Sequence, residues 1–150
     1  NLRTEVIRLL SLSEDLRQGE YTVHNNIPND IIMNSYPGAL EQVISSLITN
    51  TLRHGFEGKN QGNIFIEARC KGNELTITYK DDGIGIPEHI RTRLYEPFST
   101  TKMAQGGGGL GMYSVYNFVT SVLSGDIELL DVGAVGVEFV IRLPLAVDDK

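Results

Sequence analysis

The sequence predicts a single α+β domain, a two-layer α/β sandwich in which helices cover one face of a mixed, mostly antiparallel sheet. Two observations support this class. Segments with helical periodicity alternate with pairs of alternating, strand-like segments, and short turns join most of those pairs. At 150 residues the chain is long enough to bury a core without disulfides or metals, so we expect one domain over residues 1–150. Because the chain starts at Asn1 rather than at a methionine, we interpret it as a fragment of a longer protein.

The predicted elements follow from periodicity and from turn residues. A leucine stripe predicts a first helix over 2–17, and apolar residues at three- and four-residue steps predict a second helix that begins at Pro37 and runs to Thr51. Alternation predicts strands at 21–27, 64–70, 75–79, 126–130 and 137–143, and a further short strand at 31–33. A short helix is expected at 88–94, a polar glycine-rich loop at 99–109, and a last helix at 110–123 that Gly125 terminates.

Composition excludes several functional classes. The net charge of −6 and pI near 5.0 disfavour nucleic acid or an anionic membrane surface as the main partner. Cys70 is alone, so neither a disulfide framework nor a thiolate metal cluster is expected, which suits a reducing, cytoplasmic location. No apolar run approaches the roughly 20 residues that a membrane span requires, although a longer parent protein could be anchored in the inner membrane.

The stretch QGGGGLGMYSV at 105–115 allows two interpretations, a flexible linker or a backbone that wraps a phosphate. A P-loop pattern is absent from the chain. Gly106, Gly108 and Gly111 match a dinucleotide GxGxxG motif literally, but that motif requires a strand immediately before it, and residues 99–105 have no strand character. The dinucleotide interpretation is therefore rejected on context.

Three further features point to a nucleotide. Asn50 lies at the margin of the apolar stripe of the second helix, where an amide oxygen suits a hard cation such as Mg²⁺. Asp81-x-Gly83-x-Gly85 follows a predicted strand, so its carboxylate could accept the exocyclic amine of adenine while the glycines let the ring approach the backbone. Glu96-Pro97-Phe98 precedes Ser99-Thr-Thr-Lys102, an aromatic anchor beside a loop that carries a cation. Taken alone, Asn50 is more typical of a polar surface, and Asp81-x-Gly83-x-Gly85 is more typical of an ordinary turn.

Taken in order, these four features resemble the N, G1, F and G2 boxes of sensor histidine kinase catalytic domains. Those domains are Bergerat-fold ATPases, related to gyrase, Hsp90 and MutL. The resemblance extends from about residue 2 to Leu143-Pro144-Leu145. It implies the Bergerat fold, ATP and Mg²⁺ as cofactors, and phosphoryl transfer from ATP to a histidine.

The resemblance also implies roles for individual residues. Asn50 would bind Mg²⁺, Arg53 would reach phosphate, and Asp81 would accept the adenine amine. His54 packs beside the nucleotide or only interacts with the end of its helix, and Lys102 reaches the γ-phosphate or is a solvated loop residue; both pairs of alternatives stay open. Asn50, Arg53 and Lys102 are the candidate catalytic residues. The full expected nucleotide-binding set is Asn50, Arg53, His54, Asp81, Gly83, Gly85, Ile86, Phe98, Thr101, Lys102, Gly107, Gly108, Gly109, Leu110 and Gly111.

Three positions depart from the family pattern. Ser46 stands four residues before Asn50, where hydrolysing relatives carry a glutamate that activates water, and Glu41 is out of register to replace it. Val137 follows Gly136 where a threonine often helps to hold adenine, which puts one adenine contact in doubt. Asp82 stands where many relatives have asparagine, and we expect this change to leave the fold intact.

The resemblance implies a catalytic domain that phosphorylates a histidine on a separate dimerisation domain, for onward transfer to a response regulator, within a homodimeric parent. His24, His54 and His89 lack the sequence context of such an acceptor, so the isolated chain is expected to bind ATP without phosphorylating itself efficiently. The alternatives are a non-catalytic nucleotide-binding module, an ATP-driven conformational ATPase, which Ser46 disfavours, and a serine-protein kinase of the same fold.

Overall fold

The computed structural model describes residues 1–11, 20–33, 35–52, 61–84, 108–130 and 136–146. Its helices are α1 (Leu2–Ser11), α3 (Pro37–Asn50) and α5 (Gly108–Asn117), which continues into a π-helical turn, η3 (Phe118–Val122). The strands are β1 (Glu20–Asn26), β2 (Gln61–Lys71), β3 (Glu74–Asp81), β4 (Asp126–Leu130) and β5 (Val137–Pro144). None of the helices in these ranges is long and apolar enough to cross a membrane.

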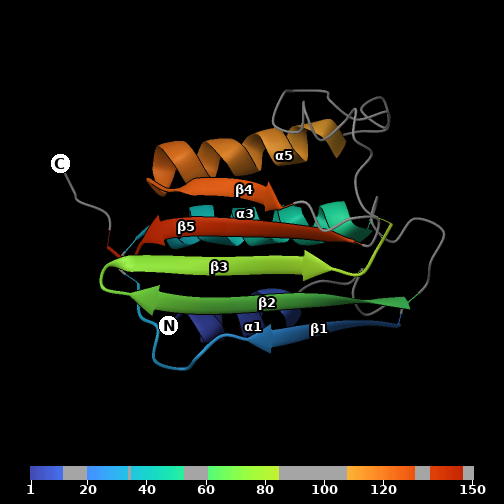
Figure 1. Cartoon of the computed structure of the whole chain (residues 1–150), viewed down its shortest axis with the longest axis horizontal. Coiled ribbons are helices and arrows are strands. Elements are labelled where there is room, and N and C mark those ends of the chain that lie inside the picture. Colours follow the sequence, from blue (N-terminus) through green and yellow to red (C-terminus); the bar gives the residue numbers. More distant parts are fainter. Residues whose placement is uncertain (12–19, 34, 53–60, 85–107, 131–135, 147–150) are drawn as a thin grey trace.

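The strands form one five-stranded sheet in the order β1-β2-β3-β5-β4. Among the described residues, only β1 and β2 pair in parallel; the other three pairs are antiparallel, as the sequence predicted. Gly72 has φ +62° in the tight turn between β2 and β3, a conformation that glycine adopts without strain. Because β3 and β5 are antiparallel, β3 ends where β5 begins (Figure 1).

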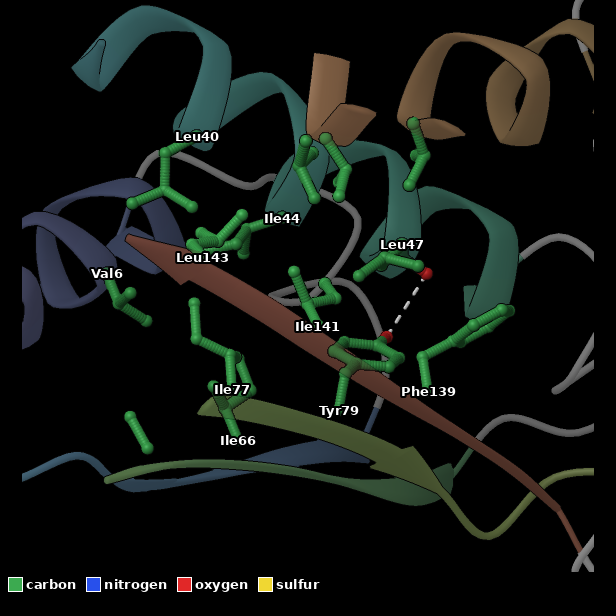
Figure 2. Close-up of a cluster of buried hydrophobic side chains, with 14 of the residues drawn as sticks. Val6, Leu40, Ile44, Leu47, Ile66, Ile77, Tyr79, Phe139, Ile141 and Leu143 are labelled. Carbon is green, nitrogen blue, oxygen red and sulfur yellow. Dashed lines mark hydrogen bonds between the residues drawn. The ribbon is translucent and has the colours of Figure 1, made fainter. Parts of the chain in front are cut away.

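The helices form one layer on a single face of the sheet, and the core lies between the two layers (Figures 1 and 2). Strand alternation directs every second side chain into this core, for example Leu75, Ile77 and Tyr79 of β3. The stripe of α3 packs against them through Val43, Ile44 and Leu47. Residues of α1 and α5, such as Val6 and Val115, complete the same cluster.

The last helix differs from its prediction in its start and in the geometry of its final turn. It begins two residues earlier than expected, at Gly108, and it widens over Phe118–Val122 into the π-helical turn before ending at Leu123. The amide of Gly125 then donates to the carbonyl oxygen of Val119 over 2.8 Å. A Cβ atom at Gly125 would lie 2.0 Å from the carbonyl oxygen of Arg142, so only glycine permits this close approach of the helix end to β5.

The predicted strand at 31–33 is wrong. Residues 31–33 belong to no strand; Ile31 is buried while Ile32 is 72% exposed, and the carbonyl oxygen of Ile31 accepts the amide of Leu2 over 3.0 Å. This short apolar segment anchors the start of α1 instead of pairing with the sheet. The predicted helix at 88–94 and the end of the first predicted helix, 12–17, lie outside the described residues.

Candidate functional site

The candidate site is centred on Asp81, the last residue of β3. Its side chain points into the core, in register with Tyr79, and only 4% of the residue is exposed. The hydroxyl of Thr51 donates to its Oδ2 over 2.8 Å, and the amide of Gly83 donates to its Oδ1 over 2.9 Å. Both carboxylate oxygens are therefore anchored, one by the end of α3 and one by the backbone of the turn.

A second buried hydroxyl extends this arrangement behind Thr51. The Oη atom of Tyr79 lies 2.6 Å from Oγ1 of Thr51 and 3.1 Å from the carbonyl oxygen of Leu47 (the latter contact is drawn in Figure 2). Tyr79 and Thr51 are each 2% exposed. The core of this protein thus contains a continuous line of polar atoms from α3 to the carboxylate of Asp81.

Burial shifts the acidity of both ionisable members of this line. Desolvation raises the pKa of Asp81 above its ordinary value, and the hydrogen bonds from Gly83 and Thr51 oppose that rise. The nearby charge of Asp82 raises this pKa further, and the backbone of Val137 lowers it. Desolvation also raises the pKa of the Tyr79 phenol, so Tyr79 remains protonated at every physiological pH.

Asp82 points the other way, to the exposed face of the sheet, as strand alternation requires. Asn63 of β2 donates to it twice, through its backbone amide over 2.8 Å and its side-chain amide over 2.9 Å. The remaining amide oxygen of Asn63 lies 3.0 Å from Nε2 of His24, which therefore carries the proton. Asp82 ties β3 to β2, and the two adjacent aspartates have separate structural tasks.

The backbone beside Asp81 is fixed by two glycines. Gly83 is buried, and its carbonyl oxygen accepts the amide of Gly136 over 2.9 Å. Gly136 has φ +72°, and a Cβ atom there would lie 2.0 Å from the carbonyl oxygen of Asp81. Val137 follows it, pairs with Asp81 across the sheet and is buried. The start of β5 therefore lies directly against the predicted base-binding turn.

The structure places two other predicted elements at this end of the molecule. Asn50 is half-buried at the last position of α3, immediately before Thr51. The backbone of Gly108, Gly109, Leu110 and Gly111 forms the first turn of α5, which packs against α3. Figure 1 shows the end of β3, the start of β5 and the start of α5 at the same end of the sheet.

The other predicted site residues lie outside the described residues: Arg53, His54, Gly85, Ile86, Phe98, Thr101, Lys102 and Gly107. Their roles stay predictions. Ser46 is half-buried and accepts the side-chain amide of Gln42 over 3.2 Å, while Glu41 forms an ion pair with Arg8 of α1. Glu41 thus belongs to the contact between two helices, in agreement with its being out of register with Ser46.

Sequence reasoning overlooked Thr51 and Tyr79. Periodicity predicts that both side chains are buried, because Tyr79 shares the inward face of β3 with Ile77 and Asp81, and Thr51 follows Leu47 by one helical turn. It does not predict that the two side chains meet. A hydroxyl at an inward position of an apolar stripe must find a hydrogen-bond partner. The partner of Thr51 is the carboxylate of Asp81, and the partners of Tyr79 are Oγ1 of Thr51 and the carbonyl oxygen of Leu47.

A five-stranded mixed sheet with one helical layer, a buried aspartate at a strand end and a glycine-rich helix start define an ATPase-like nucleotide-binding class. The chain belongs to the family described as "Histidine kinase-, DNA gyrase B-, and HSP90-like ATPase", whose sequence profile matches residues 36–147.

Individual relatives narrow this assignment. The sensor histidine kinase RcsC of Salmonella typhimurium is 32% identical over 119 residues, which cover 77% of this chain and 12% of RcsC. The chain thus spans about an eighth of the length of such curated relatives. The solved catalytic domain of the histidine kinase ThkA, 20% identical, superposes with a TM-score of 0.79 over 98% of this chain and 96% of its own.

Full-length ShkA, solved in complex with AMPPNP, shares 18% identity with this chain and superposes with a TM-score of 0.78, over 100% of this chain and 31% of its own. At these identities the two solved structures establish the fold, and the family match establishes the kind of domain. The chain is an ATP-binding catalytic domain of the histidine kinase type.

Proposed function

We propose that this domain binds Mg·ATP at the Asp81 end of the sheet and transfers the γ-phosphoryl group to a histidine on a separate dimerisation domain. The phosphoryl group would then pass to a response regulator. The observation that supports this most is the carboxylate of Asp81, which is buried, anchored at both oxygens and next to a turn that only glycine can form.

An adenine base suits this carboxylate. An ionised carboxylate only accepts hydrogen bonds, at about four lone-pair sites, and after the bonds from Thr51, Gly83 and the backbone of Val137 it retains the capacity to accept one more. The exocyclic amine of adenine offers a donor, whereas a guanine base presents a carbonyl oxygen at the same position. Gly83 carries no side chain, so a flat ring could approach the backbone beside Asp81 closely.

The phosphates would extend from the base toward the end of α3 and the start of α5. Asn50 can offer its amide oxygen to Mg²⁺, an ion that prefers oxygen ligands, and its half-buried position leaves room for the waters that this ion retains. The first turn of α5 directs backbone amides and the positive end of the helix dipole toward an anion. Arg53 and Lys102 would add positive charge, and residues 99–109 would close over the triphosphate as a lid.

Phosphoryl transfer needs mainly positioning and charge neutralisation, which these groups would provide; bound Mg²⁺ would neutralise phosphate charge. Efficient hydrolysis needs a base that activates water. Ser46 cannot act as that base at neutral pH, so we propose that the domain transfers its phosphoryl group and turns over slowly in water. A site that uses ATP suits a cytoplasmic location for this domain.

The Mg²⁺ role of Asn50 can be tested by titrating ATP with and without Mg²⁺. Asn50→Ala should remove most of the Mg²⁺-dependent gain in affinity, a loss of roughly tenfold, because one inner ligand is lost. Thr49→Ala is the matched control, since Thr49 is the exposed neighbour on the same helix and should leave the affinity unchanged. An Asn50→Ala protein with an undiminished Mg²⁺ effect would contradict this assignment.

The reaction itself distinguishes a kinase from a nucleotide-binding module without catalysis. Incubation of this domain with labelled Mg·ATP and a histidine-bearing dimerisation domain of the parent should place acid-labile phosphate on that domain. The isolated 150-residue chain should incorporate far less than one phosphate per molecule. Binding of ATP without any transfer would favour the non-catalytic module, and acid-stable phosphate on a partner would favour a serine kinase.

A further inference from the structure

The function proposed so far uses Thr51 only as an anchor of one oxygen of Asp81, and it gives the buried hydroxyl of Tyr79 no role. Oγ1 of Thr51 lies 2.8 Å from Oδ2 of Asp81 and 2.6 Å from Oη of Tyr79, and that Oη lies 3.1 Å from the carbonyl oxygen of Leu47. Burying hydroxyls in an apolar core costs free energy unless they are hydrogen-bonded, so the line formed by these atoms has to be ordered.

Counting protons fixes the direction of this line. Thr51 and Tyr79 each have one hydroxyl proton. When Asp81 is ionised, it can only accept, so Thr51 donates to Asp81 and Tyr79 must donate to Thr51. The carbonyl oxygen of Leu47 then keeps the backbone amide of Thr51 as its donor. Both hydroxyl dipoles therefore point toward the carboxylate.

This arrangement also fixes how the carboxylate is oriented. Thr51 holds Oδ2 and the amide of Gly83 holds Oδ1, so the carboxylate plane cannot rotate about its terminal bond without breaking one of the two hydrogen bonds. A group that is immobilised before the ligand arrives loses less entropy on binding. The orientation of Asp81 thus depends on a side chain from α3 as well as on the turn.

Among the described residues, Thr51 is the only side chain that donates to Asp81. The strand opposite Asp81 provides the buried, apolar side chain of Val137 and contributes only through its backbone. Val137 lacks the hydroxyl of the threonine that often helps to hold adenine at its position, and Thr51 provides a hydroxyl to Asp81 from α3 instead.

We propose that Thr51, supported by Tyr79, is a specificity-determining positioning residue that holds Asp81 as an oriented acceptor for the 6-amino group of adenine. This inference rests on the proposed function, because it assumes that Asp81 meets an adenine base. It predicts that Thr51 contributes to the discrimination between a 6-amino and a 6-oxo purine and not to binding of the phosphates.

The test compares ADP with inosine diphosphate, which carries a carbonyl oxygen in place of the 6-amino group. Calorimetric titrations of both ligands should be made with the wild-type chain and with Thr51→Val, Thr51→Ser and Tyr79→Phe. Thr51→Val preserves the shape of the side chain and removes the hydroxyl. It should weaken ADP binding roughly 5- to 20-fold and leave inosine diphosphate binding unchanged, since only ADP uses the oriented carboxylate.

Thr51→Ser restores the hydroxyl and should restore at least half of the lost discrimination on a logarithmic scale. Tyr79→Phe removes only the supporting donor and should reduce the ADP preference by a smaller factor, about 2- to 5-fold. Each Kd should be referred to the folded fraction, which a denaturant titration of the same variant provides. If Thr51 had only a structural role, Thr51→Val would weaken the binding of ADP and of inosine diphosphate equally, and Thr51→Ser would not restore the preference for ADP.

The outcomes separate this inference from the proposed function. If the wild-type chain binds neither ligand, the proposed function fails. If it prefers ADP and Thr51→Val keeps the whole preference, only the inference about Thr51 fails. Equal losses for both ligands in Thr51→Val, or no recovery in Thr51→Ser, would also contradict it. A full ADP preference in Tyr79→Phe would remove Tyr79 from the proposal.

Discussion

At the scale of single residues, adjacent aspartates at the end of β3 serve opposite faces of the sheet. Asp81 turns into the core toward Thr51, and Asp82 turns outward to Asn63. The inward position of Asp81 was predictable, because it continues the alternation of Ile77 and Tyr79. The hydroxyls that orient it were not predicted, because periodicity identifies which side chains are buried but not which of them meet across the core.

Asp81→Asn is expected to be at least as stable as the wild type at pH 7. The side-chain amide of an asparagine can donate to Thr51, and its oxygen can still accept from the amide of Gly83. Thr51 can then donate to Tyr79, and Tyr79 to the carbonyl oxygen of Leu47. The substitution satisfies the same polar line in the reverse direction and removes a buried charge. Urea denaturation at several pH values would measure this.

The sign of the pH dependence follows from the raised pKa of Asp81. The folded protein retains the proton at pH values where the unfolded chain, with a pKa of about 3.9, has lost it. The ionised carboxylate therefore costs stability, and the cost increases as the pH rises from about 4 through the native pKa. The advantage of Asp81→Asn should increase over this window and then level off.

Asp82→Asn is the matched control for that experiment, because Asp82 is exposed and keeps one acceptor for Asn63 after substitution. It should show no comparable increase in relative stability with pH. A loss of more than about 1 kcal/mol in the free energy of unfolding of Asp81→Asn at pH 7 would contradict this prediction. It would mean that the hydrogen bonds to the ionised carboxylate offset the cost of burying its charge.

At the scale of elements, segments with strong periodicity were predicted correctly as the helices and strands that build the core. A segment with weak periodicity was assigned to the wrong structure. The apolar stripe of α3 and the alternation in β2, β3 and β5 placed those elements within a few residues. The three-residue segment 31–33 carries too little pattern to distinguish a strand from an anchored coil, and its contact with Leu2 is a tertiary effect. The π-helical turn after α5 also has no signature in simple periodicity.

The turn at Gly136 should be intolerant of any side chain. Gly136→Ala would place a residue at φ +72° with its Cβ atom 2.0 Å from the carbonyl oxygen of Asp81, so the start of β5 or the end of β3 must move. We expect a loss of roughly 2–4 kcal/mol in the free energy of unfolding and weaker nucleotide binding. Denaturant titration and calorimetry would measure the two effects.

Gly38→Ala is the matched control for Gly136→Ala. Gly38 is exposed in the first turn of α3, its φ is not positive, and a Cβ atom there meets nothing within 4 Å. Alanine is the better helix former, so this variant should gain about 0.5–1 kcal/mol. Equal changes in the free energy of unfolding of the two variants would contradict this prediction, because they would show that the turn at Gly136 accommodates a Cβ atom without strain.

The first turn of α5 should become more ordered when nucleotide binds. Gly108, Gly109 and Gly111 give this turn a low intrinsic helix propensity, and phosphate contacts would offset the entropy that glycine loses on ordering. Hydrogen exchange of the amides at 108–111 should therefore slow on addition of Mg·ATP, while the buried amides of β3 stay protected in both states. Equal exchange with and without Mg·ATP would contradict a phosphate role for this turn.

At the scale of the whole molecule, the sheet order explains why residues far apart in sequence form one site. The antiparallel pairing of β3 with β5 brings Asp81 and Gly136 together, and α3, packed over both strands, contributes Thr51 to the same place. The fold class was predictable from four motifs in order, and the location of the nucleotide site at the Asp81 end of the sheet stays a prediction. The roles of residues in 53–60 and 85–107 stay predictions, because these segments lie outside the described residues.

The central claim is that Asp81 recognises the base of ATP, and a calorimetric titration of Mg·ATP into the wild-type chain and into Asp81→Asn tests it most directly. The wild type should bind one ATP per chain, and the folded Asp81→Asn protein should bind it about 30-fold more weakly or not at all, since a charged acceptor has been lost. Equal affinity of the two proteins for ATP, or no binding by the wild type, would contradict the claim.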